Sequence, residues 1–245
     1  MKLLIIGGAG KVGRIINNTL AAEHTCRHFD RVPVPGYENE TIIADVHDND
    51  AIREAMTGVD SVLYMALGIR PGEPKSIYEP DVAFGVNTVA FYKLMSVAVE
   101  LKIRHIVYAS TMSIFGHRGE WDDVIHDQTP PKSWDAYGFS KRMGEEICKT
   151  TAERMPEATI LAPRLMWPCT DDEWAERQAR LAAPDAKPDP AWRPLGPVDT
   201  RSFFQKLLAC NTPGAHFMIT TGDVEEQRYR HDVAKQLLNW QPQGR

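Results

Sequence analysis

The sequence has little of what disulfide-bonded, metal-binding or membrane-spanning proteins depend on. Its 245 residues include four cysteines, which lie far apart at positions 26, 148, 169 and 210 and form no Cys-x-x-Cys pair. A disulfide framework or a zinc site therefore has little support, so we expect no bound metal and a reducing, cytoplasmic location. No apolar run approaches the ~20 residues of a membrane span, and the apolar N-terminus runs into a glycine loop rather than a signal-peptide cleavage site.

Excess positive charge is also missing. The chain has 28 Lys and Arg against 33 Asp and Glu, which gives a net charge of -5. An acidic surface repels phosphate backbones, so we expect no binding to nucleic acid or to anionic membranes. The composition is 43% hydrophobic and 25% charged, which is ordinary for a globular protein and argues against disorder. A small molecule is the partner that these features favour.

Short apolar runs alternate with helical patterns along most of the chain. Helical spacing follows the first run and recurs over 49–57, 82–101 and 136–154. The alternation predicts an α/β fold with a doubly wound parallel sheet of the Rossmann type over 1–165. After five prolines between 184 and 197, the pattern resumes as helix 200–210, strand 216–220 and helix 224–239, so we expect residues 166–245 to form a small, dependent substrate-binding lobe. The predicted strands of the sheet are 2–7, 26–30, 41–45, 61–67, 104–110 and 158–164.

Three glycines stand between the first predicted strand and its helix. Gly7, Gly10 and Gly13 have the spacing G-x-x-G-x-x-G. Such a loop turns tightly, lets the backbone approach a pyrophosphate and presents the free N–H groups of a helix N-terminus to it. The alternative is a tight turn without a ligand, but the strand–loop–helix context favours dinucleotide binding.

An acidic residue follows at the distance that a dinucleotide site needs. Asp30 ends the second predicted strand, 23 residues after Gly7. A carboxylate there accepts hydrogen bonds from the ribose hydroxyls and repels a 2′-phosphate, which favours NAD over NADP. Arg31 lies next to it and is able to pair with such a phosphate, so NADP stays open. Asp45 ends the third predicted strand and is a candidate for the adenine edge or a solvated turn residue.

A tyrosine and a lysine share one face of the predicted helix 136–154. Tyr137 and Lys141 are four residues apart in YGFSK. To act as an acid or base near pH 7, a phenol with pKa ~10 must lose ~3 units, or ~4 kcal/mol, to which a lysine charge ~4–6 Å away contributes substantially. Hydroxyl residues follow the strand 104–110, where Thr111 and Ser113 stand at the sheet edge that binds ligands in parallel sheets. These hydroxyls are placed to hold a substrate oxygen.

Together these motifs resemble the extended short-chain dehydrogenase/reductase family, also called the NAD-dependent epimerase/dehydratase family, over about residues 1–168. The resemblance implies that Tyr137 is the catalytic acid/base and that Lys141 lowers its pKa and holds the nicotinamide ribose. It also implies that Thr111, four residues before the aromatic of Phe115–Gly116, is the partner hydroxyl. The residues that carry it are GGAGKVG, Asp30, Asn87 in FGVNTVAFYKL, Ala66 in LYMALG, YASTMSIFG, YGFSK and LLNWQP.

The resemblance gives roles to two further residues and limits the reaction. Asn87 matches an asparagine that is structural and near the active site, and Ala66 matches a residue that lines the cofactor cleft. Family dehydratases have Asp-Glu after the threonine, whereas Met112 and Ser113 stand here, so the acid for water elimination is missing. Nucleotide-sugar epimerases of the family usually exceed 300 residues, so the shorter chain favours a smaller substrate.

Among small members of the family, the sequence resembles uronate dehydrogenases. These have a Cys-Thr pair after the strand that follows the YxxxK helix, as at Cys169–Thr170 here, and an arginine for the substrate carboxylate at the position of Arg177. Their Asn-His after the catalytic hydroxyl is replaced by Met112–Ser113. The alternative for Arg177 is a solvated charge on an acidic helix.

These observations predict an NAD-dependent oxidoreductase that moves a hydride to or from a secondary alcohol or hemiacetal of a small sugar-type substrate. An NAD-dependent sugar epimerase is the alternative within enzymes, because it uses the same hydride steps. A non-catalytic NAD-binding redox sensor is the alternative from another class. The helix 82–101 is apolar around more than one stripe, and family members commonly pair through this helix and the tyrosine helix, so we expect a homodimer.

Overall fold

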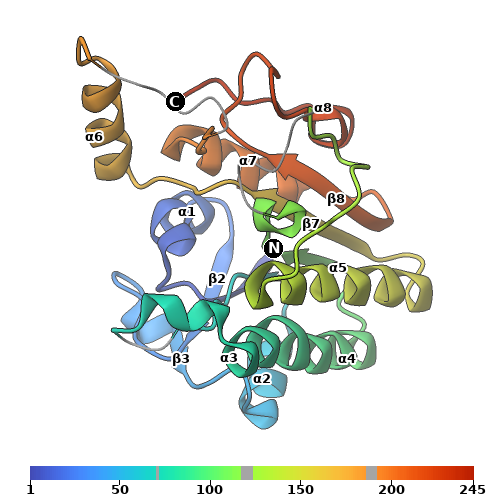
Figure 1. The fold of residues 1–245 in the computed structure, drawn as a ribbon. Coiled ribbons are helices and arrows are strands. Elements are labelled where there is room, and N and C mark those ends of the chain that lie inside the picture. Colours follow the sequence, from blue (N-terminus) through green and yellow to red (C-terminus); the bar gives the residue numbers. More distant parts are fainter. Residues whose placement is uncertain (70–71, 117–123, 186–191) are drawn as a thin grey trace.

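A parallel β-sheet runs through the protein, with helices packed around it (Figure 1). The computed structural model describes residues 1–69, 72–116, 124–185 and 192–245. The strand order is β3-β2-β1-β4-β5-β7-β8, and the short strand β6 continues β5 alongside β7. The predicted doubly wound parallel sheet is therefore confirmed. The strands are β1 (Lys2–Ile6), β2 (Thr25–Asp30), β3 (Thr41–Ile43), β4 (Ser61–Tyr64), β5 (His105–Tyr108), β6 (Ser110–Thr111), β7 (Thr159–Leu165) and β8 (Gly214–Thr220).

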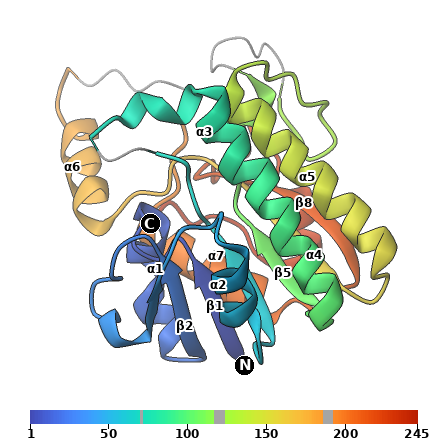
Figure 2. The same ribbon diagram turned by 90° about the horizontal axis from the view of Figure 1, so that it is seen from below.

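Helices cover both faces of the sheet because neighbouring residues of each strand point to opposite sides. In β1, Leu3 and Ile5 belong to one buried cluster and Leu4 and Ile6 to the other. Helices α1 (Lys11–Ala21), α7 (Pro197–Ala209) and α8 (Asp232–Leu238) cover the first face. Helices α2 (Asn49–Met56), α4 (Phe91–Leu101) and α5 (Ala136–Arg154) cover the second, where α4 and α5 lie side by side (Figure 2).

The helix predicted over 82–101 is longer and more complex than expected. It comprises α3 (Pro80–Phe84), a π-helical turn (Gly85–Ala90) and α4. The stretch Pro80–Leu101 is the one helix of the described residues that is long and apolar enough to cross a membrane by length and composition, with a mean hydropathy of 1.5 over an 18-residue window. That finding corrects the expectation that no apolar run approaches this length. Phe91, Leu94 and Met95 are buried against the sheet, as expected for the core helix of a globular protein, which passes the same test.

The last third of the chain contributes to the same sheet. Strand β8 pairs with β7 over its whole length, and α7 lies against α1 on the sheet. The division of the chain at residue 165 into a cofactor-binding domain and a substrate-binding lobe stays a prediction. Helix α6 (Asp171–Leu181) stands apart from these layers (Figure 1).

Several predicted elements are shorter in the structure, including the strand predicted over 61–67, which is observed as Ser61–Tyr64. The closing helix spans Asp232–Leu238 only, because the Asp223 carboxylate accepts hydrogen bonds from the main-chain N–H groups of Arg228 and Tyr229 and holds the preceding residues in a loop. Strand β3 ends at Ile43, so Asp45 lies beyond it.

Candidate active site

The glycine loop is pressed against the end of β4. Gly7 has φ +86°, in the left-handed region that favours glycine, and a Cβ there would lie 2.7 Å from the Ala66 nitrogen. Ala66 is thereby placed beside the loop, and its role in lining the cofactor cleft stays a prediction. A Cβ at Gly13 would lie 2.1 Å from the Gly8 carbonyl oxygen, so this glycine permits the close approach of helix and loop.

Helix α1 offers an open N-terminus to an anion. Gly10 is its N-cap residue and supplies no side-chain cap, so the N–H groups of the first turn are not covered by a side chain. A Cβ at Gly10 would stand 3.2 Å from the Gly7 carbonyl oxygen, inside the cradle. These groups, together with the positive end of the helix dipole, fit the diphosphate of a dinucleotide.

Asp30 is fixed at the end of β2 by the loop that it adjoins. Its Oδ2 accepts a hydrogen bond of 2.9 Å from the Ala9 nitrogen and its Oδ1 one of 2.7 Å from the Arg31 nitrogen. Arg31 is exposed and donates to the Ile69 carbonyl oxygen at 2.8 Å. Asp45 is exposed, and its carboxylate accepts a hydrogen bond from the His47 nitrogen at 3.0 Å. This contact is typical of a solvated turn residue, which was one of the two alternatives for Asp45.

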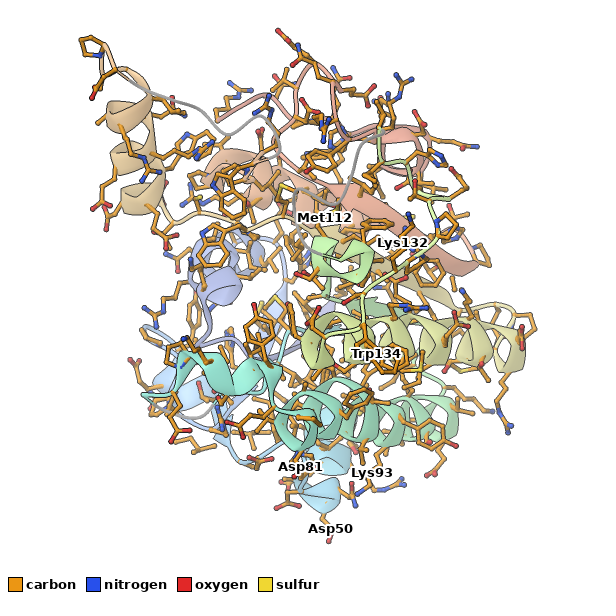
Figure 3. The ribbon with its side chains drawn as sticks, viewed as in Figure 1. Asp50, Asp81, Lys93, Met112, Lys132 and Trp134 are labelled. Carbon is orange, nitrogen blue, oxygen red and sulfur yellow. The ribbon has the colours of Figure 1, made fainter. Side chains whose placement is uncertain are left out.

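Thr111 and Tyr137 are joined through their side chains. A hydrogen bond from Thr111 acts on the Tyr137 hydroxyl and lowers its pKa, against the larger effect of burial, which raises it. Thr111 ends β6, just before Met112 at the edge of the sheet (Figure 3), and its Oγ1 accepts from the Ser113 nitrogen at 3.1 Å. Gly138 lets the two segments meet, because a Cβ there would lie 2.5 Å from the Ser113 carbonyl oxygen. The structure thus brings the predicted hydroxyl pair together.

Lys141, four residues after Tyr137 on α5, lies in the interior of the protein. Its side chain is buried, its Nζ donates to the Ala109 carbonyl oxygen at 2.8 Å, and the same atom lies 4.7 Å from the centre of the Tyr108 ring. Burial lowers the pKa of Lys141 to about 7. Without partners of opposite charge, a buried ammonium group is only marginally favoured near neutral pH.

The family resemblance implies that Lys141 lowers the pKa of Tyr137. For the chain's own groups, the structure indicates the opposite direction for this pKa. Burial raises the pKa of Tyr137 to about 12, and the hydrogen bond from Thr111 offsets only part of that rise. The reason is that Lys141 is itself desolvated and directed to a carbonyl group. Positive charge from outside the chain is therefore needed to bring the phenol into the neutral range.

Asn87 connects the π-helical turn to the tyrosine helix. Its Nδ2 donates to the Ser140 hydroxyl at 3.0 Å, and that hydroxyl donates to the Tyr137 carbonyl oxygen at 2.9 Å. The main-chain oxygen of Asn87 accepts from the Tyr108 hydroxyl at 3.1 Å. Asn87 is fully buried, which agrees with a structural position near the site. The sequence reasoning missed Ser140 and Tyr108, although both stand inside the motifs YGFSK and YASTMSIFG.

Arg177 lies on α6 and is half-buried. It donates to the Trp192 carbonyl oxygen at 3.3 Å, so at least part of its guanidinium group serves the protein itself. Its predicted role in binding a substrate carboxylate stays a prediction.

The chain is similar to a known family and to several known proteins. A model described as the NAD dependent epimerase/dehydratase family matches residues 3–166. The chain is 26% identical over 243 residues to an L-arabinose 1-dehydrogenase (NAD(P)(+)) of Haloferax volcanii, which covers 93% of this chain and 90% of that protein. It is 24% identical over 163 residues to a uronate dehydrogenase of Pseudomonas syringae pv. tomato, which covers 65% of this chain and 57% of that one.

A solved structure described as a mutated uronate dehydrogenase has the same fold. It superposes with a TM-score of 0.78 at 20% sequence identity, over 99% of this chain and 81% of the other. The chain thus spans nine tenths of the arabinose dehydrogenase but little more than half of the P. syringae uronate dehydrogenase.

Proposed function

Because this chain belongs to the NAD-dependent epimerase/dehydratase family, we propose that it transfers a hydride between NAD and a secondary alcohol or hemiacetal of a small sugar-type substrate. The family resemblance of the sequence is confirmed, and the chain is an enzyme of the short-chain dehydrogenase/reductase type with NAD as its cofactor. Sugar oxidation is supported by the dehydrogenases of arabinose and uronate among its relatives.

One observation carries the proposal: the hydroxyl pair of Thr111 and Tyr137 lies at the carboxyl edge of the sheet, the edge that also carries the glycine loop. Two hydroxyls at hydrogen-bonding distance can hold one substrate oxygen between them, and the phenol can then exchange a proton with it. Oxidised NAD, when bound, supplies the hydride acceptor and a positive charge. Thr111 orients the substrate oxygen and Tyr137 takes or returns its proton. Lys141, on the same helix as Tyr137, anchors that helix through its hydrogen bond to the Ala109 carbonyl oxygen.

The residues around the pair favour simple oxidation or reduction over elimination. Met112 is buried and Ser113 hydrogen-bonds with Thr111, so the two positions after the threonine bring no carboxylate to the substrate. Asp30 presents its carboxylate next to the glycine loop, where it repels a 2′-phosphate, so NAD is preferred over NADP.

A substrate screen tests the proposal directly. Aldoses, uronates and related alcohols are offered with NAD and, separately, with NADP, while reduced cofactor is followed by its absorbance. We expect reduction with at least one sugar-type substrate and a higher kcat/KM with NAD than with NADP. If none of these substrates reduces either cofactor although the protein binds NAD, the dehydrogenase proposal is wrong.

Epimerisation is the second candidate, and the family that the chain belongs to supports it. The same hydroxyl pair would remove and return the proton while the hydride returns to the opposite face of the substrate. Interconversion of two sugars without net change in cofactor absorbance would identify this activity. NAD binding without any turnover would instead favour the redox sensor.

We also propose that the protein is a homodimer that pairs through α4 and the beginning of α5. Tyr92 on α4 is 61% exposed, and Trp134, which precedes α5 and is labelled in Figure 3, is 85% exposed. Such large apolar side chains are unusual on a solvated surface when they gather on neighbouring helices. We expect a dimer mass by light scattering after size exclusion, and a monomer for Tyr92→Lys combined with Trp134→Lys. The control, Val224→Lys, changes an exposed apolar residue elsewhere and should stay dimeric; a monomeric wild-type protein would contradict the proposal.

A further inference from the structure

A lysine in the first turn of α1 ties the glycine loop to the C-terminal part of the chain. The Nζ of Lys11 donates to Glu173 Oε1 at 2.6 Å and lies 4.2 Å from the centre of the Trp167 ring. Both partners come after β7, more than 150 residues further along the chain. Lys11 is therefore shared between the cofactor cradle and helix α6.

Helix α6 depends on such polar contacts to stay in place. None of its residues is buried, and it projects from the body of the protein in Figures 1 and 2. Its other attachments include the ion pair between Asp171 and Arg201 and the hydrogen bond from Arg177 to the Trp192 carbonyl oxygen. Because little apolar surface holds it, a change at one charged contact is enough to alter its mobility.

The backbone of Trp167 shows strain at the same place. Its φ of +42° lies in the left-handed region, which bulky residues rarely adopt, and its ring is more than half exposed. Strain of this kind persists where the surroundings impose it and gathers at ligand sites and switch regions. The Trp167 ring contacts the ammonium group of Lys11, which is the first residue of α1.

The pairing of Lys11 with Glu173 is exchangeable. Their side chains are 37% and 39% exposed, and ion pairs at this exposure are weak. Although partial burial raises the pKa of Glu173, the hydrogen bonds from Lys11 and from the Thr170 nitrogen outweigh it and leave the pKa lowered, so the carboxylate is charged. A diphosphate bound at the first turn of α1 carries two negative charges next to the lysine's own turn and competes for the same ammonium group.

We propose that Lys11 exchanges Glu173 for the diphosphate of the cofactor, so that cofactor binding releases helix α6 from the glycine loop. The inference rests on the NAD binding of the proposed function and adds to it a residue that reports cofactor occupancy to the C-terminal part of the chain. Glu173 then acts against binding, because it holds the lysine in the free protein.

Variants of the two partners test the exchange through effects of opposite sign. Binding of ADP-ribose and of NAD is measured by titration calorimetry for the wild type, Lys11→Met and Glu173→Gln. We expect Lys11→Met to weaken binding about ten-fold, as for a lost charge-assisted hydrogen bond, and Glu173→Gln to tighten it about two- to three-fold. In the wild type, the Thr170 nitrogen donates a hydrogen bond to Glu173 Oε2 at 3.0 Å. Glutamine keeps an oxygen that can accept this hydrogen bond, so the start of α6 is preserved.

A matched control and a second readout keep the test independent of activity. Lys149→Met removes a somewhat more exposed ion pair, with Glu146 on α5, and should leave both affinities unchanged. Hydrogen exchange of residues 171–181 should rise when ADP-ribose binds to the wild type, and Glu173→Gln should show the faster exchange without ligand. Weaker binding in both variants, or no effect in either while the wild type binds, overturns this inference alone; a wild type that binds neither ligand overturns the proposed function as well.

Discussion

Replacing Tyr137 by phenylalanine is expected to lower kcat about a thousand-fold, the usual scale for loss of a positioned acid or base. The variant keeps the ring against Tyr78, whose centre lies 6.4 Å away, and loses only the hydroxyl that Thr111 contacts. Cofactor affinity, measured by calorimetry, should therefore stay close to that of the wild type. The comparison separates a role in proton transfer from a role in binding.

The dependence of the rate of alcohol oxidation on pH also tests the role of Tyr137. Burial raises the pKa of Tyr137 to about 12, so the phenolate that accepts the substrate proton becomes more abundant as the pH rises. Alcohol oxidation by the wild type is expected to speed up with pH over the alkaline side of neutrality, and the residual rate of Tyr137→Phe should lack that slope. Tyr78→Phe is the control, because it changes the adjacent phenol and should keep kcat within a few-fold. A Tyr137→Phe enzyme with the wild-type rate and slope would contradict the assignment.

Replacing Arg164 by leucine is expected to have the largest effect on stability. Arg164 and Glu145 form a buried ion pair at 2.9 Å, and the Ser110 hydroxyl donates to the same carboxylate at 2.7 Å. Removing one partner leaves the other charge buried without compensation, which costs about 3–5 kcal/mol of the free energy of unfolding. Denaturation by urea measures the loss.

A matched ion pair and a double variant sharpen this measurement. Arg104 and Glu157 form an exposed pair at 3.3 Å, so Arg104→Leu should change the free energy of unfolding by less than about 1 kcal/mol. Combining Arg164→Leu with Glu145→Leu removes both buried charges and should restore part of the stability that Arg164→Leu loses. Equal losses for Arg164→Leu and Arg104→Leu would show that burial of the pair does not matter.

The sequence predicted those parts of the site that lie within one motif or follow from the direction of parallel strands. Gly7 and Ala66 meet because two neighbouring strands end at the same edge. Thr111 and Tyr137 meet because β6 and α5 both start at that edge. The bounds of the tyrosine helix, 136–154, follow from its periodicity and agree with the structure.

Features that depend on distant contacts or on burial were beyond the sequence. Nothing in its local pattern pairs Lys11 with Glu173, because that contact depends on where the chain after β7 returns. The spacing of Tyr137 and Lys141 placed both on one helix face, but the pKa values follow from the solvent that each side chain loses, which spacing does not reveal. The π-helical turn was read as ordinary helix, because it spans only Gly85–Ala90 and is flanked by regular helix on both sides.

That wide turn makes the number of residues before α4 part of the architecture of the site. In an α-helix, each deleted residue rotates what precedes it by ~100° about the axis. Shortening 85–90 by one would thus restore regular winding but swing Asn87 away from Ser140 and its main-chain oxygen away from the Tyr108 hydroxyl. Natural variation in this segment should accordingly take the form of exchanged side chains rather than gaps.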